Sequence, residues 1–391
     1  MSLDVSPAFA LPDDAARACL VGRVWRPDLD GPSVVVLRDG ALFDISAAAP
    51  TMRDLIEADD PAGLARSAAG EALGPLGPIL ANTPPAGRDP ARPWLLAPVD
   101  LQAIKAAGVT FAVSLVERVI EEQARGDPGR AAAVRAEVTR LIGSDLAALR
   151  PGSEAAQALR EMLIARGAWS QYLEVGIGPD AEIFTKAQPM SAVGHLADIG
   201  IHPMSRWNNP EPEIVIAVTS AGRIAGASLG NDVNLRDVEG RSALLLGKAK
   251  DNTASAAIGP FIRLFDAHFG PAELARATVT LEVRGPDGFA LTGTSEMARI
   301  SRSPEELVAQ TIGPSHQYPD GFVLYLGTMF APIEDRDAPG MGFTHKPGDI
   351  VTIGCDRLGR LSNRVVPCPE AEPWRFGTAA LMRNLARRGL I

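Results

Sequence analysis

The stretch that decides the fold reads NPEPEIVI, at residues 209–216. Side chains alternate between the two faces of a strand, so Glu211 and Glu213 are expected to point the same way. The Ile-Val-Ile run after them indicates a buried strand, and two carboxylates on one face near a core repel each other unless a cation lies between them. On its own, however, the pair favours a simpler interpretation, a solvated strand end with two ordinary surface glutamates.

A second acidic segment, GNDVNLRD at residues 230–237, follows the next predicted strand. A hairpin-like return of the chain would bring Asp232 back beside the glutamate pair. Three hard oxygen ligands with open positions suit Mg²⁺, Mn²⁺ or Ca²⁺ rather than a closed zinc site. Arg236 and Asp237 have their own simpler interpretation, a structural ion pair.

Composition limits the class of protein. The chain has 391 residues, of which 47 are Asp or Glu and 38 are Lys or Arg, giving a formal charge of -9. This balance, without a basic stripe, argues against nucleic-acid binding. The longest apolar run, residues 106–116, falls short of the roughly 20 residues of a membrane span. Three cysteines without CxxC spacing exclude a Cys-based zinc site, and no secretory signal is expected, so we expect a cytoplasmic protein.

The chain divides into regions of different pattern. Residues 1–98 are predicted to form a small N-terminal mixed α/β domain, with a hairpin around Asp39-Gly40, a short helix over 52–58 and a proline-rich linker up to Pro98. Residues 99–391 are predicted to form the second, catalytic domain. Residues 115–166 within it have helical spacing and are predicted to be a helical insertion, broken at 126–129 and at 151–153.

Beyond Trp169 the sequence is β-rich, with Gly and Pro between the strands. The predicted strands are 213–218, 223–228, 278–284, 322–326 and 349–353, and the predicted helices are 255–269, 303–310 and 379–388. Strands interspersed with helices, without regular βαβ alternation, predict an α+β, mostly β architecture.

Ordered motifs along the chain resemble the fumarylacetoacetate hydrolase family. Its signature is an E-x-E strand, an N-D-x-x-x-R-D segment and a lysine shortly before Gly-Pro. Residues 211–213, residues 231–237 and Lys250 ahead of Gly259-Pro260 match it in that order. Residues 184–194, 326–328, 346–351 and 359–365 resemble the motifs that flank it.

The resemblance implies the family's rolled mixed β-sheet core, preceded by the smaller N-terminal domain, in a homodimer or higher homo-oligomer. It implies Glu211, Glu213 and Asp232 as ligands of a divalent metal, Mg²⁺ first and Mn²⁺ or Ca²⁺ as alternatives. Family members bind 2-oxo or 1,3-dioxo acids through this metal and cleave, decarboxylate, hydrate or dehydrate them. The implied partner is therefore a small-molecule acid, with no role for nucleic acid or membrane.

One departure from the family pattern narrows the reaction. Many members carry G-x-N-Y-x-x-H-x-x-E, whereas residues 108–117 read GVTFAVSLVE, with Ser114 at the histidine position and Glu117 retained. Hydrolytic C–C cleavage in the family relies on the His–Glu pair to activate water, and serine cannot be that base at neutral pH without help. Residues 108–122, 186–194 and 250–252 resemble instead a branch that dehydrates 2-keto-3-deoxy sugar acids. In oxidative pentose degradation that branch converts 2-keto-3-deoxy-pentonates, of the D-xylonate or D-arabinonate type, to 2-oxoglutarate semialdehyde.

The resemblance also implies catalytic roles. Lys250 would stabilise a developing enolate, and Glu117 would remove a C3 proton or protonate the departing C4 hydroxyl. Each has a simpler interpretation, a lysine at a helix start and a glutamate favoured by the dipole of a helix N-terminus.

The candidate substrate-binding residues are Ser114, Arg118, Lys186, Arg236 and Thr328. Three of them have alternatives that stay open: a surface salt bridge for Arg118, a buried structural cation for Lys186, and a plain strand residue for Thr328. Glu239 is expected to face solvent rather than substrate hydroxyls.

Two other functions remain alternatives to the dehydratase. One is a metal-dependent C–C bond hydrolase of acylpyruvates or other diketo acids, against which Ser114 counts. The other is a non-catalytic homologue, against which the intact set of three carboxylates and Lys250 counts.

Overall fold

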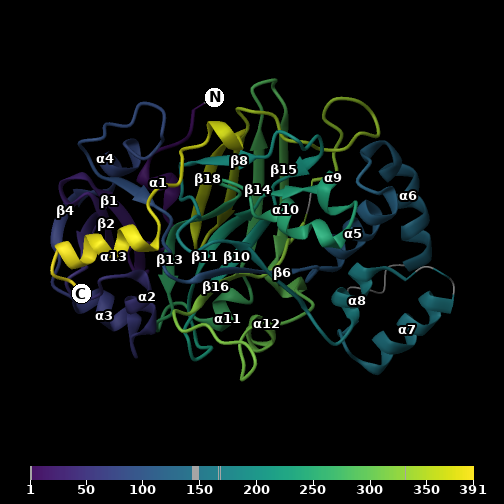
Figure 1. Cartoon of the computed structure of the whole chain (residues 1–391), viewed down its shortest axis with the longest axis horizontal. Coiled ribbons are helices and arrows are strands. Elements are labelled where there is room, and N and C mark those ends of the chain that lie inside the picture. Colours follow the sequence, from purple (N-terminus) through teal and green to yellow (C-terminus); the bar gives the residue numbers. More distant parts are fainter. Residues whose placement is uncertain (1, 143–148, 166, 168, 331) are drawn as a thin grey trace.

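Two β-sheets form the centre of the molecule, with the N-terminal elements at one end and helices α5 to α8 at the other (Figure 1). The structure is a computed structural model. It describes residues 2–142, 149–165, 167, 169–330 and 332–391.

In the described residues, eleven strands make up the larger sheet, in the order β4-β3-β2-β1-β13-β11-β10-β16-β6-β7, with β5 paired to β1. Strands β10, β11 and β13 are buried along nearly their whole length. This explains the largely apolar sequences of β10 and β13, since a strand covered on both faces has no polar side. The strands are β1 (Leu20–Arg26), β2 (Gly31–Arg38), β3 (Ala41–Asp44), β4 (Glu71–Pro75), β5 (Trp94–Leu96), β6 (Ala103–Gly108), β7 (Glu182–Ala187), β10 (Pro212–Val218), β11 (Ile224–Asp232), β13 (Ala256–Leu264) and β16 (Phe322–Tyr325).

The second sheet packs against the first and closes the main core. Its order is β15-β14-β17-β18-β8, and its strands are β8 (Asp198–Ile201), β14 (Thr278–Arg284), β15 (Ala290–Glu296), β17 (Ile350–Cys355) and β18 (Gly359–Pro367). One hydrophobic cluster joins Ile214 and Ile216 of β10 to Leu281 of β14 and Ile353 of β17. Two short strands, β9 (Asn208–Asn209) and β12 (Asn234–Leu235), pair beside the acidic segments.

The N-terminal region shares the large sheet with the rest of the chain. Strand β1 pairs antiparallel with β13, so one continuous sheet crosses the predicted domain boundary at residue 98. The boundary itself stays a prediction. The predicted hairpin is confirmed: Arg38 faces Ala41, and Asp39 and Gly40 both have positive φ, at 48° and 76°. The proline-rich stretch is more than a linker, because it contains a helix and β5. The helices here are α1 (Pro7–Ala10), α2 (Met52–Glu57), α3 (Pro61–Ser67) and α4 (Leu76–Ala81).

The helices predicted within residues 115–166 are confirmed where the structure describes them, and with α8 they pack around a small core of their own, while their being an insertion in the catalytic domain stays a prediction. The helices are α5 (Ala112–Ala124), α6 (Pro128–Ile142), α7 (Glu154–Ala165) and α8 (Gln171–Ile177). Leu115, Val119 and Ile120 of α5 are buried against Leu163 of α7 and Leu173 of α8. Both predicted breaks separate helices, and Gly126 and Gly152 have positive φ there.

The structure corrects two expectations. The predicted helix over 255–269 is wrong: most of this segment is strand β13, which pairs with β11 on one side and with β1 on the other. The description "mostly β" is also wrong, since helices and strands contribute almost equal numbers of residues to a mixed fold.

The other predicted helices and strands beyond residue 169 match the structure to within a few residues. The remaining helices are α9 (Arg236–Glu239), α10 (Leu246–Lys250), α11 (Pro271–Leu274), α12 (Pro304–Thr311) and α13 (Thr378–Arg387). Helix α13 returns to the N-terminal end, where the Asn384 amide donates hydrogen bonds to the carbonyls of Leu29 and Asp30. Among the described helices, none has the length and apolar character needed to cross a membrane.

Candidate active site

Three carboxylates come together where β10 and β11 pair. Oxygen atoms of Glu211, Glu213 and Asp232 lie within 4.8 Å of one another, and each residue is only 1 % exposed. The antiparallel register places Glu213 opposite Gly230, and the Asp232 backbone N–H donates to the Glu211 carbonyl at 3.0 Å. The expected return of Asp232 beside the glutamate pair is therefore confirmed, and the alternative of a solvated strand end is wrong.

Two lysines lie against this carboxylate cluster. Lys250 Nζ donates to Glu211 Oε2 at 2.5 Å and to Asp232 Oδ2 at 3.0 Å. Lys186 Nζ lies 2.7 Å from Asp232 Oδ1 and donates to the carbonyls of Lys250 and Val233. Lys186 is completely buried and is not among the residues that line the pocket beside the cluster. Its contacts support the interpretation as a buried structural cation, whereas Lys250 lines the pocket.

The surroundings of the carboxylate cluster shift the pKa values of two of its members in opposite directions. Burial alone would raise the pKa of Asp232, but Lys186 and Lys250 outweigh burial and hold that pKa below its usual range. Glu213 has no such partner, so burial and the Asp232 charge raise its pKa to about 8, although Lys250 and a hydrogen bond from Gly327 oppose the change. Three carboxylates lie close together here, and the charges of Glu213 and Asp232 repel each other. Such a set of oxygen ligands is chemically suited to a hard divalent cation such as Mg²⁺, Mn²⁺ or Ca²⁺.

The loop after β16 holds the second glutamate in place. Gly327 N donates to Glu213 Oε2 at 2.7 Å, and Thr328 Oγ1 donates to Glu213 Oε1 at 3.3 Å. Gly327 has a φ of 102°, and a Cβ there would lie 1.9 Å from Thr110 Oγ1, so only glycine fits. Thr328 also lines the pocket, which places it where a substrate-binding residue is needed.

The pocket beside the carboxylate cluster is narrow and polar. Its walls come from the end of β6, helix α5, strand β7, helix α9 and the Thr328 loop. The free volume is about 10 Å³, because basic side chains lie between the carboxylates. The lining residues are Ala107, Gly108, Val109, Ser114, Arg118, Glu182, Phe184, Glu211, Glu213, Asp232, Glu239, Lys250 and Thr328.

Arg118 is buried in this pocket, so the surface salt bridge expected as its alternative is wrong. Its Nη2 donates to Glu211 Oε1, and its Nη1 donates to Glu121 Oε2 at 2.5 Å and lies 3.2 Å from Glu239 Oε2. Glu239 is only 3 % exposed, so the expectation that it faces solvent is also wrong. Helix α9 directs it inward, beside Arg118.

Two predicted site residues lie behind the pocket wall instead of in it. Glu117 binds Arg135 through both carboxylate oxygens and Arg236 through Oε2. Arg236 donates from Nε to Glu121 Oε1 at 2.6 Å and stacks over the Trp207 ring at 4.7 Å. Neither residue lines the pocket, so the structure does not bring the predicted acid or base, Glu117, to the carboxylate cluster.

The expected ion pair of Arg236 with Asp237 does not form either. The Asp237 carboxylate accepts hydrogen bonds from Ser205 Oγ at 2.7 Å and Arg206 N at 2.8 Å. Arg236 and Asp237 therefore belong to different hydrogen-bond networks, although they are neighbours in the sequence.

Sequence reasoning missed Glu182, which lines the pocket from β7. Burial, then the nearby charge of Glu239, raise the pKa of Glu182 to about 7, although Lys250 and Arg118 oppose them. A carboxyl with a pKa near neutrality can exchange a proton at physiological pH. The alternation of Glu182, Phe184 and Lys186 along one strand face was a signal that could have found it.

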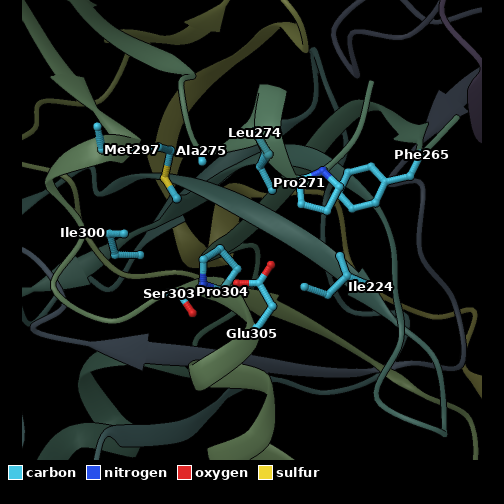
Figure 2. A pocket seen from close by; sticks show the side chains of 11 residues that line it. Ile224, Phe265, Pro271, Leu274, Ala275, Met297, Ile300, Ser303, Pro304 and Glu305 are labelled. Atoms are coloured by element: carbon cyan, nitrogen blue, oxygen red, sulfur yellow. The ribbon is translucent and has the colours of Figure 1, made fainter. Parts of the chain in front are cut away.

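A second cavity, of about 250 Å³, has a different character (Figure 2). Pro271 and Leu274 of α11 line it together with Phe265, Ile300 and Pro304, and Glu305 is its one charged lining residue. Without converging polar groups it lacks the means to polarise a substrate, whereas the acidic pocket gathers three carboxylates, Glu182 and Lys250 and is therefore the candidate active site.

Comparisons with known proteins agree with this choice. A family model described as "Fumarylacetoacetate (FAA) hydrolase C-terminal" matches residues 173–366, which include all three clustered carboxylates and Lys250. The chain is 32 % identical over 180 residues to the 2-dehydro-3-deoxy-D-arabinonate dehydratase of Saccharolobus solfataricus, covering 46 % of this chain and 57 % of that one. It is 34 % identical over 195 residues to a probable 2-keto-3-deoxyxylonate dehydratase of Haloferax volcanii, covering 50 % and 63 %. The chain thus spans 57 % to 63 % of these curated relatives.

Solved structures share the fold. A 2-keto-3-deoxy-D-arabinonate dehydratase in its apo form superposes with a TM-score of 0.60 at 19 % identity, over 89 % of this chain and 99 % of that one. A structure of that enzyme described as complexed with magnesium and 2,5-dioxopentanoate gives a TM-score of 0.59 at 18 % identity, with the same coverage. The rolled mixed-sheet fold expected from the sequence is therefore confirmed.

Proposed function

The chain belongs to the fumarylacetoacetate hydrolase family, and within it we propose a divalent-metal-dependent dehydratase of 2-keto-3-deoxy sugar acids. The proposed reaction converts a 2-keto-3-deoxy-pentonate, of the D-xylonate or D-arabinonate type, to 2-oxoglutarate semialdehyde with loss of one water. The observation that carries the proposal is the pocket itself, in which three buried carboxylates and Lys250 share a wall with Glu182, and Ser114 stands where a hydrolase would have histidine.

Glu211, Glu213 and Asp232 would hold the cation, with Mg²⁺ as the first choice and Mn²⁺ or Ca²⁺ as alternatives. When bound, such a cation acts as a Lewis acid toward the oxygens of a 2-oxo acid, which makes the neighbouring C3 protons more acidic. Lys250 lies at the same cluster and places a positive charge where an enolate oxygen would develop. Thr328 lines the same pocket, and its hydroxyl, which donates to Glu213 Oε1, would have to turn from that partner to donate a hydrogen bond to the substrate carboxylate.

Glu182 is the acid or base that the geometry supports best, in place of Glu117. Its pKa of about 7 lets it accept a C3 proton or deliver a proton to the departing C4 hydroxyl. Loss of the C3 proton and the C4 hydroxyl leaves a C3=C4 enone that keeps its C5 hydroxyl. Transfer of a carbon-bound C5 proton to C3 gives the C4=C5 enol, whose hydroxyl proton then moves to C4 to form the aldehyde, so atoms balance without an attacking hydroxide.

Ser114 supports dehydration over C–C hydrolysis. Its hydroxyl donates to the Phe111 carbonyl at 2.9 Å, one turn back on its own helix. No basic nitrogen lies at this position, so the pocket has no histidine to activate a hydrolytic water. We also propose that the protein forms a homodimer, because the resemblance to the family implies one.

The test is incubation of the purified protein with 2-keto-3-deoxy-D-xylonate and Mg²⁺, followed by mass spectrometry. We expect a product lighter by one water that reacts as an aldehyde, and we expect chelation to abolish its formation. Glu213→Gln should abolish it as well, whereas Glu296→Gln, on the exposed end of β15, should not. Pyruvate together with a two-carbon fragment would contradict the proposal, and hydrolysis of an acylpyruvate without any dehydration would favour the hydrolase instead.

A further inference from the structure

An unbroken series of buried ion pairs runs from helix α6 to the carboxylate cluster. Arg135 of α6 binds Glu117 of α5, Glu117 binds Arg236 of α9, and Arg236 binds Glu121 of α5. Glu121 then binds Arg118, which binds Glu211. Apart from Arg135, which is 33 % exposed, the side chains in this series are at most 8 % exposed. We call these six residues the charge series.

Glu121 is the central member of the charge series. Its two oxygens have separate partners: Oε1 accepts from Arg236 at 2.6 Å and Oε2 accepts from Arg118 at 2.5 Å. The residue is 1 % exposed and lies outside the pocket. Burial would raise its pKa, but Arg118 and Arg236 outweigh burial and keep the pKa low, so its charge is fixed.

Arg118 divides its charge between Glu121 and Glu211. Both are fully buried anions, so water cannot replace either partner at low cost. If Glu121 lost its charge, Arg118 would keep only Glu211 and Glu239 as partners and would hold the Glu211 carboxylate more firmly. A carboxylate held more firmly by an arginine is a poorer ligand for a cation.

We propose that Glu121 is a positioning residue for the metal centre: by sharing Arg118 with Glu211, it sets the affinity of the carboxylate cluster for a divalent cation. This inference rests on the metal site of the proposed function. It also gives the insertion a role, because α5 supplies both Arg118 and Glu121. Groups that orient metal ligands typically change affinity by about 10- to 100-fold when removed.

The experiment measures Mn²⁺ binding by electron paramagnetic resonance, without substrate, in a double-mutant cycle. Glu121→Gln should raise the Mn²⁺ dissociation constant about tenfold in the wild-type background. In an Arg118→Met background the same substitution should have no further effect, because the shared partner is gone. The matched control is Asp349→Asn, which breaks an equally buried pair with Arg336, just before strand β17 of the other sheet. It should lower the melting temperature and leave Mn²⁺ binding unchanged.

An unchanged dissociation constant in Glu121→Gln, or an equal increase in both backgrounds, would overturn the inference. If Glu121→Gln does not fold, Glu121→Asp keeps the charge but shortens its reach, and the same cycle applies with the same two contradicting outcomes. A wild-type protein that binds no Mn²⁺ also overturns it. A protein that shows the expected coupling but forms no dehydration product refutes the proposed function alone.

Discussion

Glu182, like Glu213, differs from the other acids of the site in its partners. Within the described residues, Glu211, Asp232 and Glu121 each contact a basic side chain, whereas Glu182 forms no ion pair and lies near the charge of Glu239. An acid in this position keeps its proton up to near-neutral pH. The environment, rather than the residue type, therefore makes it suited to proton transfer.

Replacement of Glu182 by Gln should lower kcat for dehydration by about 10²- to 10⁴-fold, the usual contribution of a general acid or base. The Mn²⁺ dissociation constant should change little, because Glu182 is not one of the three clustered ligands. Steady-state kinetics and metal titration of the variant measure the two effects, with Glu296→Gln as the exposed control. Full activity in Glu182→Gln would show that another group of the pocket is the general acid or base.

His195 should make the protein less stable in acid. Its Nδ1 accepts a hydrogen bond from Ser362 N at 3.0 Å, the ring is completely buried, and burial lowers its pKa to about 3. The unfolded pKa is about 6.5, so this contribution to stability is fully present above that pH. It is lost as pH falls toward 3, at about 1.4 kcal/mol per pH unit.

Urea unfolding between pH 7 and pH 5 measures this dependence. In His195→Asn, which keeps an acceptor, we expect a lower free energy of unfolding at pH 7. We also expect a shallower loss between pH 6.5 and 5, by about 1.4 kcal/mol per unit. The exposed His316 provides the control, since His316→Asn should keep the wild-type slope. Identical slopes in His195→Asn and the wild type would refute this account.

Among the elements, the hairpins show where local sequence is sufficient. The β2–β3 turn forms as expected because Asp39 and Gly40 both tolerate the positive φ of a tight two-residue turn. By contrast, residues 256–264 are apolar on both faces, and such a run fits a buried strand as well as a buried helix. Pairing with β1 and β11 decided that it is a strand, and this information lies far away in the sequence.

The turn can be tested by comparing two glycines. Gly40 has a φ of 76°, and no atom lies within 4 Å of the position that a Cβ would take, so Gly40→Ala should cost about 1 kcal/mol of stability through backbone strain alone. Gly247, in helix α10, also has open space, but without a positive φ. There the substitution to Ala should stabilise by up to about 1 kcal/mol. Chemical denaturation of the two variants measures the difference, and equal effects would contradict the role of backbone conformation.

At the scale of the whole molecule, the site is a junction of distant segments. Helix α5 lies at the end formed by α5 to α8, whereas the carboxylates belong to the central sheet (Figure 1). A cation bound to Glu211, Glu213 and Asp232 would join β10 to the end of β11, and it binds only where the folded chain has gathered them.

Metal binding should therefore stabilise the fold. At a free Mg²⁺ concentration 100 times the dissociation constant, linkage predicts about 2.7 kcal/mol of additional stability. Thermal unfolding with and without Mg²⁺, at matched ionic strength, measures the shift in melting temperature. Glu213→Gln should lose most of the shift and Glu296→Gln should retain it. A shift of the same size in both variants would show that the stabilisation comes from another site.

The sequence by itself determined the hairpin, the breaks in the insertion and the three carboxylates, because these depend on turn chemistry and on motifs a few residues long. It also supplied the family and the fold. Only the tertiary structure decided that Glu117 and Arg236 lie behind the pocket, that Glu182 and Glu239 lie in it, and that 256–264 is a strand. Which side chain faces the pocket depends on how α5, α9 and β7 pack together, and the alternation along a strand such as β7 tells only which residues share a face, not what that face meets.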